Sequence, residues 1–402
     1  MLNSARKMSF LVLAALLAIF LIGCENPETG SLYVENAGSP NPQPAITSIS
    51  PTGGAFAGMD TLTIVGSNFS TVLAENTVLF GTTTATILSA TATQMKVIPP
   101  LVTGDNIGVR VSVFRASLFS NTINYKLSAA IEKFGGLLDF EAAAGIAVDA
   151  AGNLYASYTS NGAEAGILKL TGSGARSAYA PSSPGVAMWA SIKMGPSNIL
   201  YAARGVRAIY AFPANGGGVA ALWQAFPTGV SISDLDFDGD KNIWAGGNNT
   251  NIFRVEPNKT VTTYPFVGAV RSLRVYNGFL YFSAKTDAGD KIWRAQISGA
   301  GLGTPEVYFD FGAFYPNASA LGITFSSDGV LFIGTDGPAR IVVVQATKAH
   351  GAPYMTYSAL VSPACNSFAW GSGENLYASA SNGFLVKIVA RGKQGSPNYG
   401  AN

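Results

Sequence analysis

The side chains that most often carry catalysis are scarce in this chain. Among 402 residues there are one histidine, His350, and two cysteines, Cys24 and Cys365. His350 lies in Lys348–Gly351, a segment typical of a surface turn, and Cys365 directly precedes a predicted strand in another part of the sequence. A thiol nucleophile needs a neighbouring base, so Cys365 is interpreted as a buried structural thiol. We therefore predict no catalytic residue and no cofactor.

Residues 234–240, with the sequence Asp-Leu-Asp-Phe-Asp-Gly-Asp, form the segment that most resembles a cation loop. Alternation places Leu235 and Phe237 on one face of a strand and Asp236 on the other. Asp238-Gly239-Asp240 has the composition of a β-turn, and the glutamate that closes an EF-hand loop is missing. A strand followed by a β-turn is favoured over a calcium site, and no metal site is predicted.

The N-terminus combines a basic pair, an apolar run and a small residue before a cysteine. Arg6 and Lys7 precede the apolar residues 8–21, and the run ends in Leu21-Ile22-Gly23-Cys24. This order is typical of a secretory signal, and its end resembles the lipobox of bacterial lipoproteins. The resemblance implies removal of residues 1–23 and lipidation of Cys24, which would attach the chain to a membrane. A retained signal anchor is the alternative, although the run is short of the roughly 20 residues that span a bilayer.

The chain that follows is electrically balanced. Without residues 1–23 it has 23 basic and 23 acidic side chains, so it offers no field to attract nucleic acid. Residues 24–43 are rich in Pro, Asn, Gly and Glu and are predicted to form a lipidated tether. The residue after Cys24 is Glu25 rather than Asp, which in the sorting rule of enteric lipoproteins implies the outer membrane.

Residues 44–127 have the pattern of a small all-β sandwich, with short alternating segments broken by Gly, Asn and Pro. The predicted strands are 45–50, 61–65, 77–80, 85–88, 95–98, 108–114 and 122–126. The motifs Ile46–Gly54, Leu62–Phe69, Val78–Gly81 and Val97–Pro100 closely resemble the IPT/TIG immunoglobulin-like fold. The resemblance implies a structural module, and no cluster of His, Cys or carboxylates suggests chemistry in it.

A repeat occupies residues 128–393, before a C-terminal tail at 394–402. Its anchors are short apolar strands centred on Leu154, Leu200, Ile243, Leu280, Leu331 and Leu376, which are 46, 43, 37, 51 and 45 residues apart. This period is close to that of four-stranded propeller blades. Residues 145–155 and 322–332 resemble the NHL repeat. Outer strands are predicted at 177–180, 221–225, 261–264, 307–311 and 355–358. The last unit lacks one, which residues 131–134 could supply, since closure removes exposed edges. We predict an all-β chain, in which an immunoglobulin-like β-sandwich is followed by a six-bladed β-propeller.

Propellers of this kind usually bind ligands at the loops that enter the innermost strand and the loops between the second and third strands. Aromatic faces beside amides and charges suit a sugar or a peptide. The candidate binding residues on these loops are Phe140, Trp189, Arg204, Arg207, Asn249, Arg271, Lys285, Asp287, Tyr315, Asn317 and Asp336.

Three functions remain open from the sequence. The first is a non-catalytic envelope lipoprotein that binds a glycan or an envelope protein, similar to accessory proteins of polysaccharide uptake in the Bacteroidetes. The second is a metal-dependent lactonase, because six-bladed propellers resemble the gluconolactonase and SMP-30 family, whose Glu, Asn and Asp ligands would here be Glu141, Asn317 and Asp234. The local sequence of that family is not reproduced around these residues. The third function is a protein-interaction scaffold or adhesin.

Overall fold

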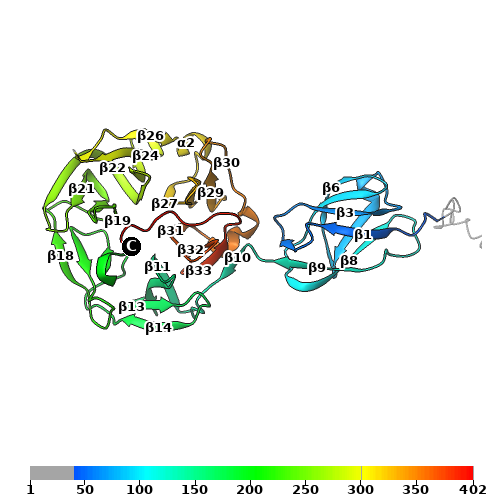
Figure 1. Ribbon diagram of the computed structural model, residues 1–402, viewed down its shortest axis with the longest axis horizontal. Helices are drawn as coiled ribbons and strands as arrows, with labels where there is room; N and C mark the ends of the chain where they lie inside the picture. Colours follow the sequence, from blue (N-terminus) through cyan, green and yellow to red (C-terminus); the bar gives the residue numbers. More distant parts are fainter. Residues whose placement is uncertain (1–39, 300, 402) are drawn as a thin grey trace, which may run out of the picture. The chain divides into compact units, whose positions relative to one another are not determined.

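The computed structural model describes residues 40–299 and 301–401. The predicted signal segment, the lipidation site at Cys24 and the tether up to residue 39 lie outside the described residues. Within the described part, no helix is long and apolar enough to cross a membrane. Strands dominate the described residues, as Figure 1 shows, which confirms the predicted all-β class.

The N-terminal unit is a sandwich of two sheets. One sheet has the strand order β1 (Ala45–Ser50), β3 (Leu62–Ser67), β7 (Gln94–Ile98) and β6 (Thr86–Ala90). The other has the order β2 (Ala55–Phe56), β9 (Ile123–Ser128), β8 (Gly104–Val113), β4 (Asn76–Phe80) and β5 (Thr83–Thr84). Alternate residues of the strands, such as Ile64, Val97 and Val111, are fully buried between the sheets. All seven predicted strands are present, and the two-residue strands β2 and β5 were not predicted.

Two residues at the end of the predicted tether bond to the sandwich. Asn41 forms a parallel bridge with Ala116 and donates from its side chain to the Phe114 carbonyl at 2.8 Å. The Gln43 amide donates to the Phe119 carbonyl at 2.7 Å. These two polar side chains of the predicted tether therefore fasten the chain to the loop between β8 and β9.

The C-terminal unit is a ring of blades, each with its strands in antiparallel order from the centre outward (Figure 1). Among the described residues the strands group into six blades. Blade 1 contains β11 (Glu141–Val148), β12 (Leu154–Ser160), β13 (Ala163–Leu170) and β14 (Arg176–Ala180), and blade 2 contains β15 (Ser191–Met194), β16 (Leu200–Ala203), β17 (Ala208–Ala211) and β18 (Ala221–Ala225). Blade 3 contains β19 (Asp234–Phe237), β20 (Ile243–Gly246), β21 (Asn248–Val255) and the first half of β22 (Val261–Tyr276). Blade 4 contains the second half of β22, β23 (Phe279–Thr286), β24 (Gly289–Ser298) and β26 (Glu306–Phe309), with β25 (Gly301–Leu302) at the end of β24. Blade 5 contains β27 (Ala320–Phe325), β28 (Leu331–Thr335), β29 (Ile341–Val344) and β30 (His350–Gly351), and blade 6 contains β31 (Cys365–Trp370), β32 (Asn375–Ala380), β33 (Leu385–Val389) and β10 (Ile131–Lys133).

Blades 3 and 4 share one continuous strand. The 16-residue β22 is the outermost strand of blade 3 and then the innermost strand of blade 4. The change occurs at Ala269, which pairs with Asn248 on one side and with Lys285 on the other. Blades 3 and 4 therefore form one continuous sheet, where two separate strands were predicted.

The last blade is closed by a strand from the start of the ring, as predicted. Ile131 pairs with Ile388, and Lys133 pairs with Val386, in antiparallel register. The closure places Phe134 against Tyr377 in the core between blades 6 and 1, with ring centroids 4.7 Å apart. Because both ends of the ring contribute to one sheet, blade 6 cannot form without the first strand of the unit.

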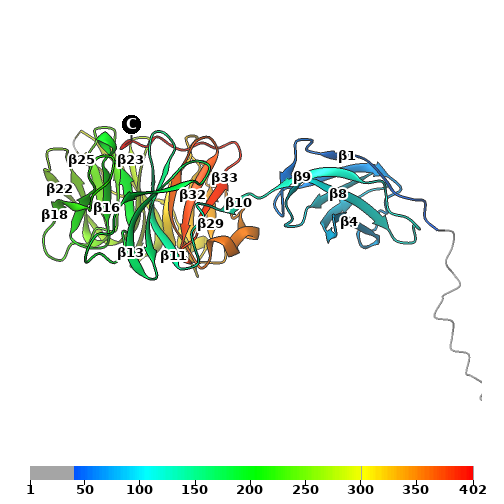
Figure 2. The same ribbon diagram turned by 90° about the horizontal axis from the view of Figure 1, so that it is seen from below.

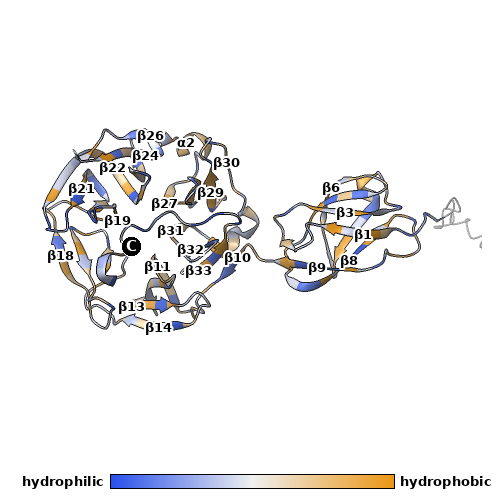
Figure 3. Cartoon of the chain, in the orientation of Figure 1, coloured by the Kyte–Doolittle hydropathy of each residue, from blue (hydrophilic) through white to orange (hydrophobic). Residues whose placement is uncertain are grey.

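Hydrophobic cores lie between neighbouring blades, and Figure 3 shows the apolar residues concentrated on strands. The side chains that fill these spaces include Trp244 and Phe282, which are both fully buried. Burying a side chain of this size contributes about 1.5–3 kcal/mol. The apolar alternation seen in the sequence is therefore the packing surface between blades.

The Asp238 turn has the predicted structure. The Asp238 carboxylate accepts the backbone N–H of Asp240 at 3.0 Å and of Asn242 at 2.9 Å. It also accepts the indole N–H of Trp244 at 2.8 Å. The carboxylate thus holds the turn between β19 and β20 and satisfies a buried donor.

Two predictions about blade 5 are wrong. Residues 355–358 were predicted to form its outer strand, but Met355–Val361 is a 3₁₀ helix whose buried residues are Tyr357 and Val361. The outer strand is His350–Gly351, so His350 lies in a short edge strand rather than in a turn. His350 is exposed as expected. The interpretation of Cys365 is confirmed, because it is a free, fully buried cysteine.

The C-terminal tail packs against the propeller instead of leaving it. Residues 394–401, here called the strap, run across one end of the ring (Figures 1 and 2). Three hydrogen bonds hold the strap. The Ser327 N–H donates to the Gln394 carbonyl, and the Ser396 N–H donates to the Phe325 carbonyl. The Asn398 side-chain amide donates to the Val148 carbonyl.

The far end of the strap is held by close packing. The Lys241 ammonium donates to the Tyr399 carbonyl at 2.6 Å. A Cβ atom added at Gly400 would lie 2.2 Å from the Met194 carbonyl oxygen, so only glycine fits there. The strap therefore contacts blades that are far apart around the ring.

Candidate functional site

One end of the propeller collects the loops that the sequence analysis selected. Because neighbouring strands in a blade are antiparallel, the loops entering each innermost strand and the loops between the second and third strands lie at the same end, here called the ligand face. The strap covers the opposite end, where the innermost strands finish. The ligand face and the strap end therefore present different surfaces.

A hollow of about 780 Å³ on the ligand face lies over blades 3 and 4. We call it the blade 3–4 groove. The loop before β19 and parts of β21, β22 and β23 form its walls, and amide and hydroxyl side chains predominate among its polar groups. Its lining includes Thr228, Asn248, Asn249, Thr250, Asn251, Thr263, Val267, Lys285, Thr286 and Asp287.

The Asn249 side chain uses both its polar groups in hydrogen bonds within the protein, so it shapes the groove and offers no free polar group to a ligand. Its side-chain oxygen accepts the Ser231 N–H at 2.7 Å, and its side-chain nitrogen donates to the Ser231 carbonyl at 2.6 Å. This pair of bonds ties the start of β21 to the loop before β19. Lys285, near the end of β23, and Asp287, in the turn that follows it, are exposed and also line the groove. Three predicted binding residues are therefore brought to one groove.

A smaller hollow of about 210 Å³ lies on blade 5. Tyr315 and Asn317 line it on one side, and Pro338 and Ala339 line it on the other. The Tyr315 hydroxyl lies 3.0 Å from Nδ1 of His350, and burial raises the pKa of this tyrosine. This hollow is mostly apolar and has room for a small group.

Two further predicted residues on the ligand face form structural contacts. The Asp336 carboxylate accepts the Ser319 N–H at 2.6 Å. Arg271 forms an ion pair with Asp290 and donates to the Ala320 carbonyl at 3.0 Å. Asp336 links two loops of blade 5, and Arg271 links blades 4 and 5. Both therefore shape the ligand face by holding loops together.

The remaining predicted residues lie on blades 1 and 2. Phe140 is 50% exposed, and Arg207 is exposed and reaches the Thr228 hydroxyl at 3.4 Å. Trp189 is wrongly predicted as a stacking surface, because it is 1% exposed and packs against Phe212 in the core between these blades. Arg204 lies near the Trp189 ring, 5.8 Å from its centroid. Of this set, Phe140, Arg204 and Arg207 keep some exposed surface.

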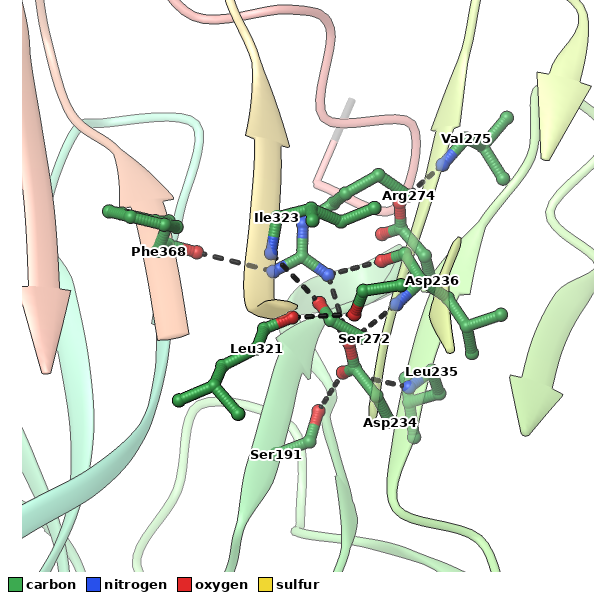
Figure 4. Close-up of polar contacts among 12 residues, drawn as sticks. Ser191, Asp234, Leu235, Asp236, Ser272, Arg274, Val275, Leu321, Ile323 and Phe368 are labelled. Carbon is green, nitrogen blue, oxygen red and sulfur yellow. Dashed lines mark hydrogen bonds and ion pairs between the residues drawn. The ribbon is translucent and has the colours of Figure 1, made fainter. Parts of the chain in front are cut away.

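The centre of the ring holds four charged residues that the sequence analysis did not select as a group. We call Lys193, Asp234, Asp236 and Arg274 the central cluster (Figure 4 shows all but Lys193). They project from the innermost strands β15, β19 and β22. Lys193, Asp236 and Arg274 line a cavity of about 80 Å³, and strap residues Ser396, Pro397 and Asn398 line it as well.

Asp234 is surrounded by donors. Its carboxylate accepts the Ser191 hydroxyl at 2.5 Å, the Ser272 hydroxyl at 2.9 Å and the Leu273 N–H at 2.8 Å. Arg274 approaches it at 3.2 Å. Burial by itself would raise the pKa of Asp234, but the positive charges of Arg274 and Lys193, together with these hydrogen bonds, hold it below its usual value. Asp234 is therefore a stable anion that joins the innermost strands of blades 2, 3 and 4.

Asp236 and Lys193 are less well compensated. Asp236 accepts the Val275 N–H at 2.8 Å, and burial raises its pKa. For Lys193, burial and then the charge of Arg274 lower the pKa to about 8, against the attraction of Asp234 and Asp236. Their positions on alternate residues of innermost strands were visible in the sequence. Their proximity was not, because it depends on how the blades are arranged around the axis.

Of the three residues considered for a lactonase metal site, the two carboxylates are each paired with an arginine. Glu141 accepts two hydrogen bonds from Arg176, each at 2.8 Å, and Asp234 is committed to the central cluster. Asn317 lies on the blade 5 loop. No group of three or more His, Cys, Asp or Glu residues suited to a metal ion occurs among residues 40–299 and 301–401.

Comparisons with known proteins identify the sandwich and relate the whole chain to other propellers. Residues 44–127 match the family model of the IPT/TIG domain, so this segment is an IPT/TIG domain. A comparison with curated proteins finds no match. An auxiliary nutrient binding protein from Bacteroides thetaiotaomicron has a TM-score of 0.50 and 10% identity, and the match covers 88% of this chain and 98% of that one.

Two enzymes have similar propellers. A gluconolactonase from Xanthomonas campestris has a TM-score of 0.50 and 14% identity, covering 62% of this chain and 86% of that chain. A luciferin-regenerating enzyme has a TM-score of 0.51 and 14% identity, covering 67% of this chain and 98% of that chain. At these identities the comparisons establish the fold that this chain shares with binding proteins and enzymes alike.

Proposed function

We propose that this protein is a non-catalytic lipoprotein of the cell envelope that binds a glycan through the blade 3–4 groove. The IPT/TIG domain acts as a spacer, and Cys24 carries the lipid anchor, in the outer membrane. The observation that carries the proposal is the groove itself, about 780 Å³ in volume and walled by asparagine and threonine side chains. Such a volume is within the range of ligand sites.

The chemistry of the groove suits a carbohydrate. Asn248, Asn251 and Thr286 offer amides and hydroxyls, which donate and accept hydrogen bonds and so match sugar hydroxyls. The exposed Val267, at 73%, offers an apolar patch for the C–H face of a sugar ring. Lys285 and Asp287 add one charge of each sign, which permits a neutral glycan or one with isolated charges.

The likeness to the auxiliary nutrient binding protein of Bacteroides thetaiotaomicron supports a binding role for this fold. The likeness to a gluconolactonase concerns the propeller alone. In this chain Glu141 and Asp234 are paired with arginines, so no observation in the described residues favours lactonase chemistry over binding.

Calorimetry against a panel of polysaccharides tests the proposal. The Lys285→Ala/Asp287→Ala variant removes both charged side chains of the groove without touching the core, and we expect it to weaken binding about tenfold or more. Lys259→Ala/Asp240→Ala is the matched control, because these side chains are exposed on turns at the strap end. Equal affinity of both variants would refute the groove as the site. If the protein captures an envelope protein and binds no glycan, the ligand is a protein and the glycan proposal is wrong.

The anchor is tested separately. Cys24→Ala should move the protein from the membrane fraction to the soluble fraction, with the thermal unfolding of the folded units unchanged. Soluble recovery of the unaltered protein without detergent would contradict the anchor.

A further inference from the structure

The loop between β8 and β9 exposes three large apolar side chains on the IPT/TIG domain. Phe114 is 61% exposed, Leu118 is 62% exposed and Phe119 is 44% exposed. Single exposed apolar residues are ordinary, but a cluster on one short loop indicates contact with another apolar phase. We call residues 114–119 the apolar loop.

The apolar loop lies where the described chain joins the sandwich. Asn41 bonds to the Phe114 and Arg115 carbonyls, and Gln43 bonds to the Phe119 carbonyl. Fifteen residues separate Pro40 from Cys24, a span of at most about 55 Å even if fully extended. If Cys24 is acylated, this loop lies where the chain from the anchor enters the sandwich, within reach of the membrane.

The charges beside the loop suit a membrane surface. Arg110 lies over the Phe119 ring, with its Cζ atom 5.1 Å from the centroid, and Arg115 is within the loop. Aromatic and aliphatic side chains flanked by arginine are typical of segments that lie in the interface of a bilayer. Arginine heads can reach the lipid phosphates while the apolar groups enter the acyl boundary.

We propose that the apolar loop binds the surface of a lipid bilayer and so orients the IPT/TIG domain on the membrane. This inference rests on the lipid anchor of the proposed function, which supplies the attachment. The loop adds a defined contact: Phe114, Leu118 and Phe119 enter the interface, and the arginines contact anionic head groups. A lipid is favoured over a second copy of the chain because the anchor brings this loop to the membrane.

Vesicle co-sedimentation tests the proposal without the acyl chains. The chain from residue 24 onward, with Cys24→Ser, is mixed with vesicles of phosphatidylethanolamine and phosphatidylglycerol at millimolar lipid. We expect Phe114→Ser/Leu118→Ser/Phe119→Ser to lower the partition coefficient by roughly tenfold. The control is Val72→Ser/Leu73→Ser/Leu88→Ser, which changes the same number of exposed apolar residues elsewhere on this domain, and it should partition like the unaltered chain.

Several outcomes would overturn the proposal. These are an equal loss in both variants, no loss in either, or no binding of the unaltered chain to vesicles. Sedimentation velocity without lipid identifies the remaining alternative: if the loop variant abolishes self-association and leaves vesicle binding unchanged, the loop is an interface between copies. Because no acyl chain and no glycan are present, the result is independent of the Cys24→Ala and groove experiments. Circular dichroism of the variants confirms that a loss does not come from unfolding.

Discussion

Replacing Lys193 by methionine should stabilise the propeller. Lys193 lies on β15 and lines the central cavity with Asp236 and Arg274. Burial removes most of the hydration of the ammonium group, and the nearby charge of Arg274 opposes it further. A buried charge without full compensation costs free energy, whereas methionine retains the length and packing of the side chain.

The size of the effect follows from the pKa of Lys193. It is about 8 in the folded protein and about 10.4 in an unfolded chain, which corresponds to about 3 kcal/mol. Because the folded pKa is the lower one, the unfolded state binds more protons between pH 8 and pH 10.4. The destabilisation by Lys193 is therefore complete below pH 8, shrinks to about 1 kcal/mol at pH 10, and disappears above pH 10.4.

Urea unfolding at pH 7 and at pH 10 measures this dependence. All five tryptophans of the chain lie in the propeller, so their fluorescence follows that unit alone. Lys193→Met should raise the free energy of unfolding by about 2–3 kcal/mol at pH 7 and by about 1 kcal/mol or less at pH 10. Lys259→Met, at an exposed turn, should change it little at either pH. A destabilised Lys193→Met variant, or a gain that is the same at both pH values, would refute the reasoning.

Three further outcomes are expected from the same unfolding assay. Arg274→Met should destabilise the propeller by about 3–5 kcal/mol, because it removes the cation nearest to the buried Asp234 carboxylate. The double variant with Asp234→Asn should recover part of this lost stability. Strictly additive losses of the two substitutions would contradict the pairing. Deletion of residues 394–402 should cost about 2–4 kcal/mol through the lost hydrogen bonds of the strap, and an unchanged unfolding midpoint would show that the strap does not hold the ring. Asp238→Ala should cost about 1–3 kcal/mol, since the indole N–H of Trp244 loses its acceptor, whereas Asp240→Ala should have little effect.

The arrangement of strands was largely predictable because it is local. Each anchor strand repeats at the period of a blade, and its apolar alternation records the packing between blades. The closing strand at residues 131–133 could be found because the last unit lacked one strand. The strand predicted at residues 355–358 is wrong, because the alternation in Met-Thr-Tyr-Ser is typical of a strand as well. The segment 355–361 forms a 3₁₀ helix that buries Tyr357 and Val361.

The candidate site was predictable only as a set of loops. Lys285 and Asp287 line one groove, but Trp189 fills the space between two blades. An aromatic residue on a loop looks the same in the sequence whether it turns outward or inward. Its direction depends on the packing of side chains from neighbouring blades, such as Phe212.

By itself, the order of residues determined the strand pattern, the IPT/TIG domain and the closure of the ring, since each depends on local alternation, turns and counting. The tertiary structure decided which residues meet at the axis. Lys193, Asp234 and Arg274 come from three different blades, and only the closing of the ring brings their charges together. It also decided that the strap covers one end of the ring, because a glycine such as Gly400 has a role only once the Met194 carbonyl lies against it.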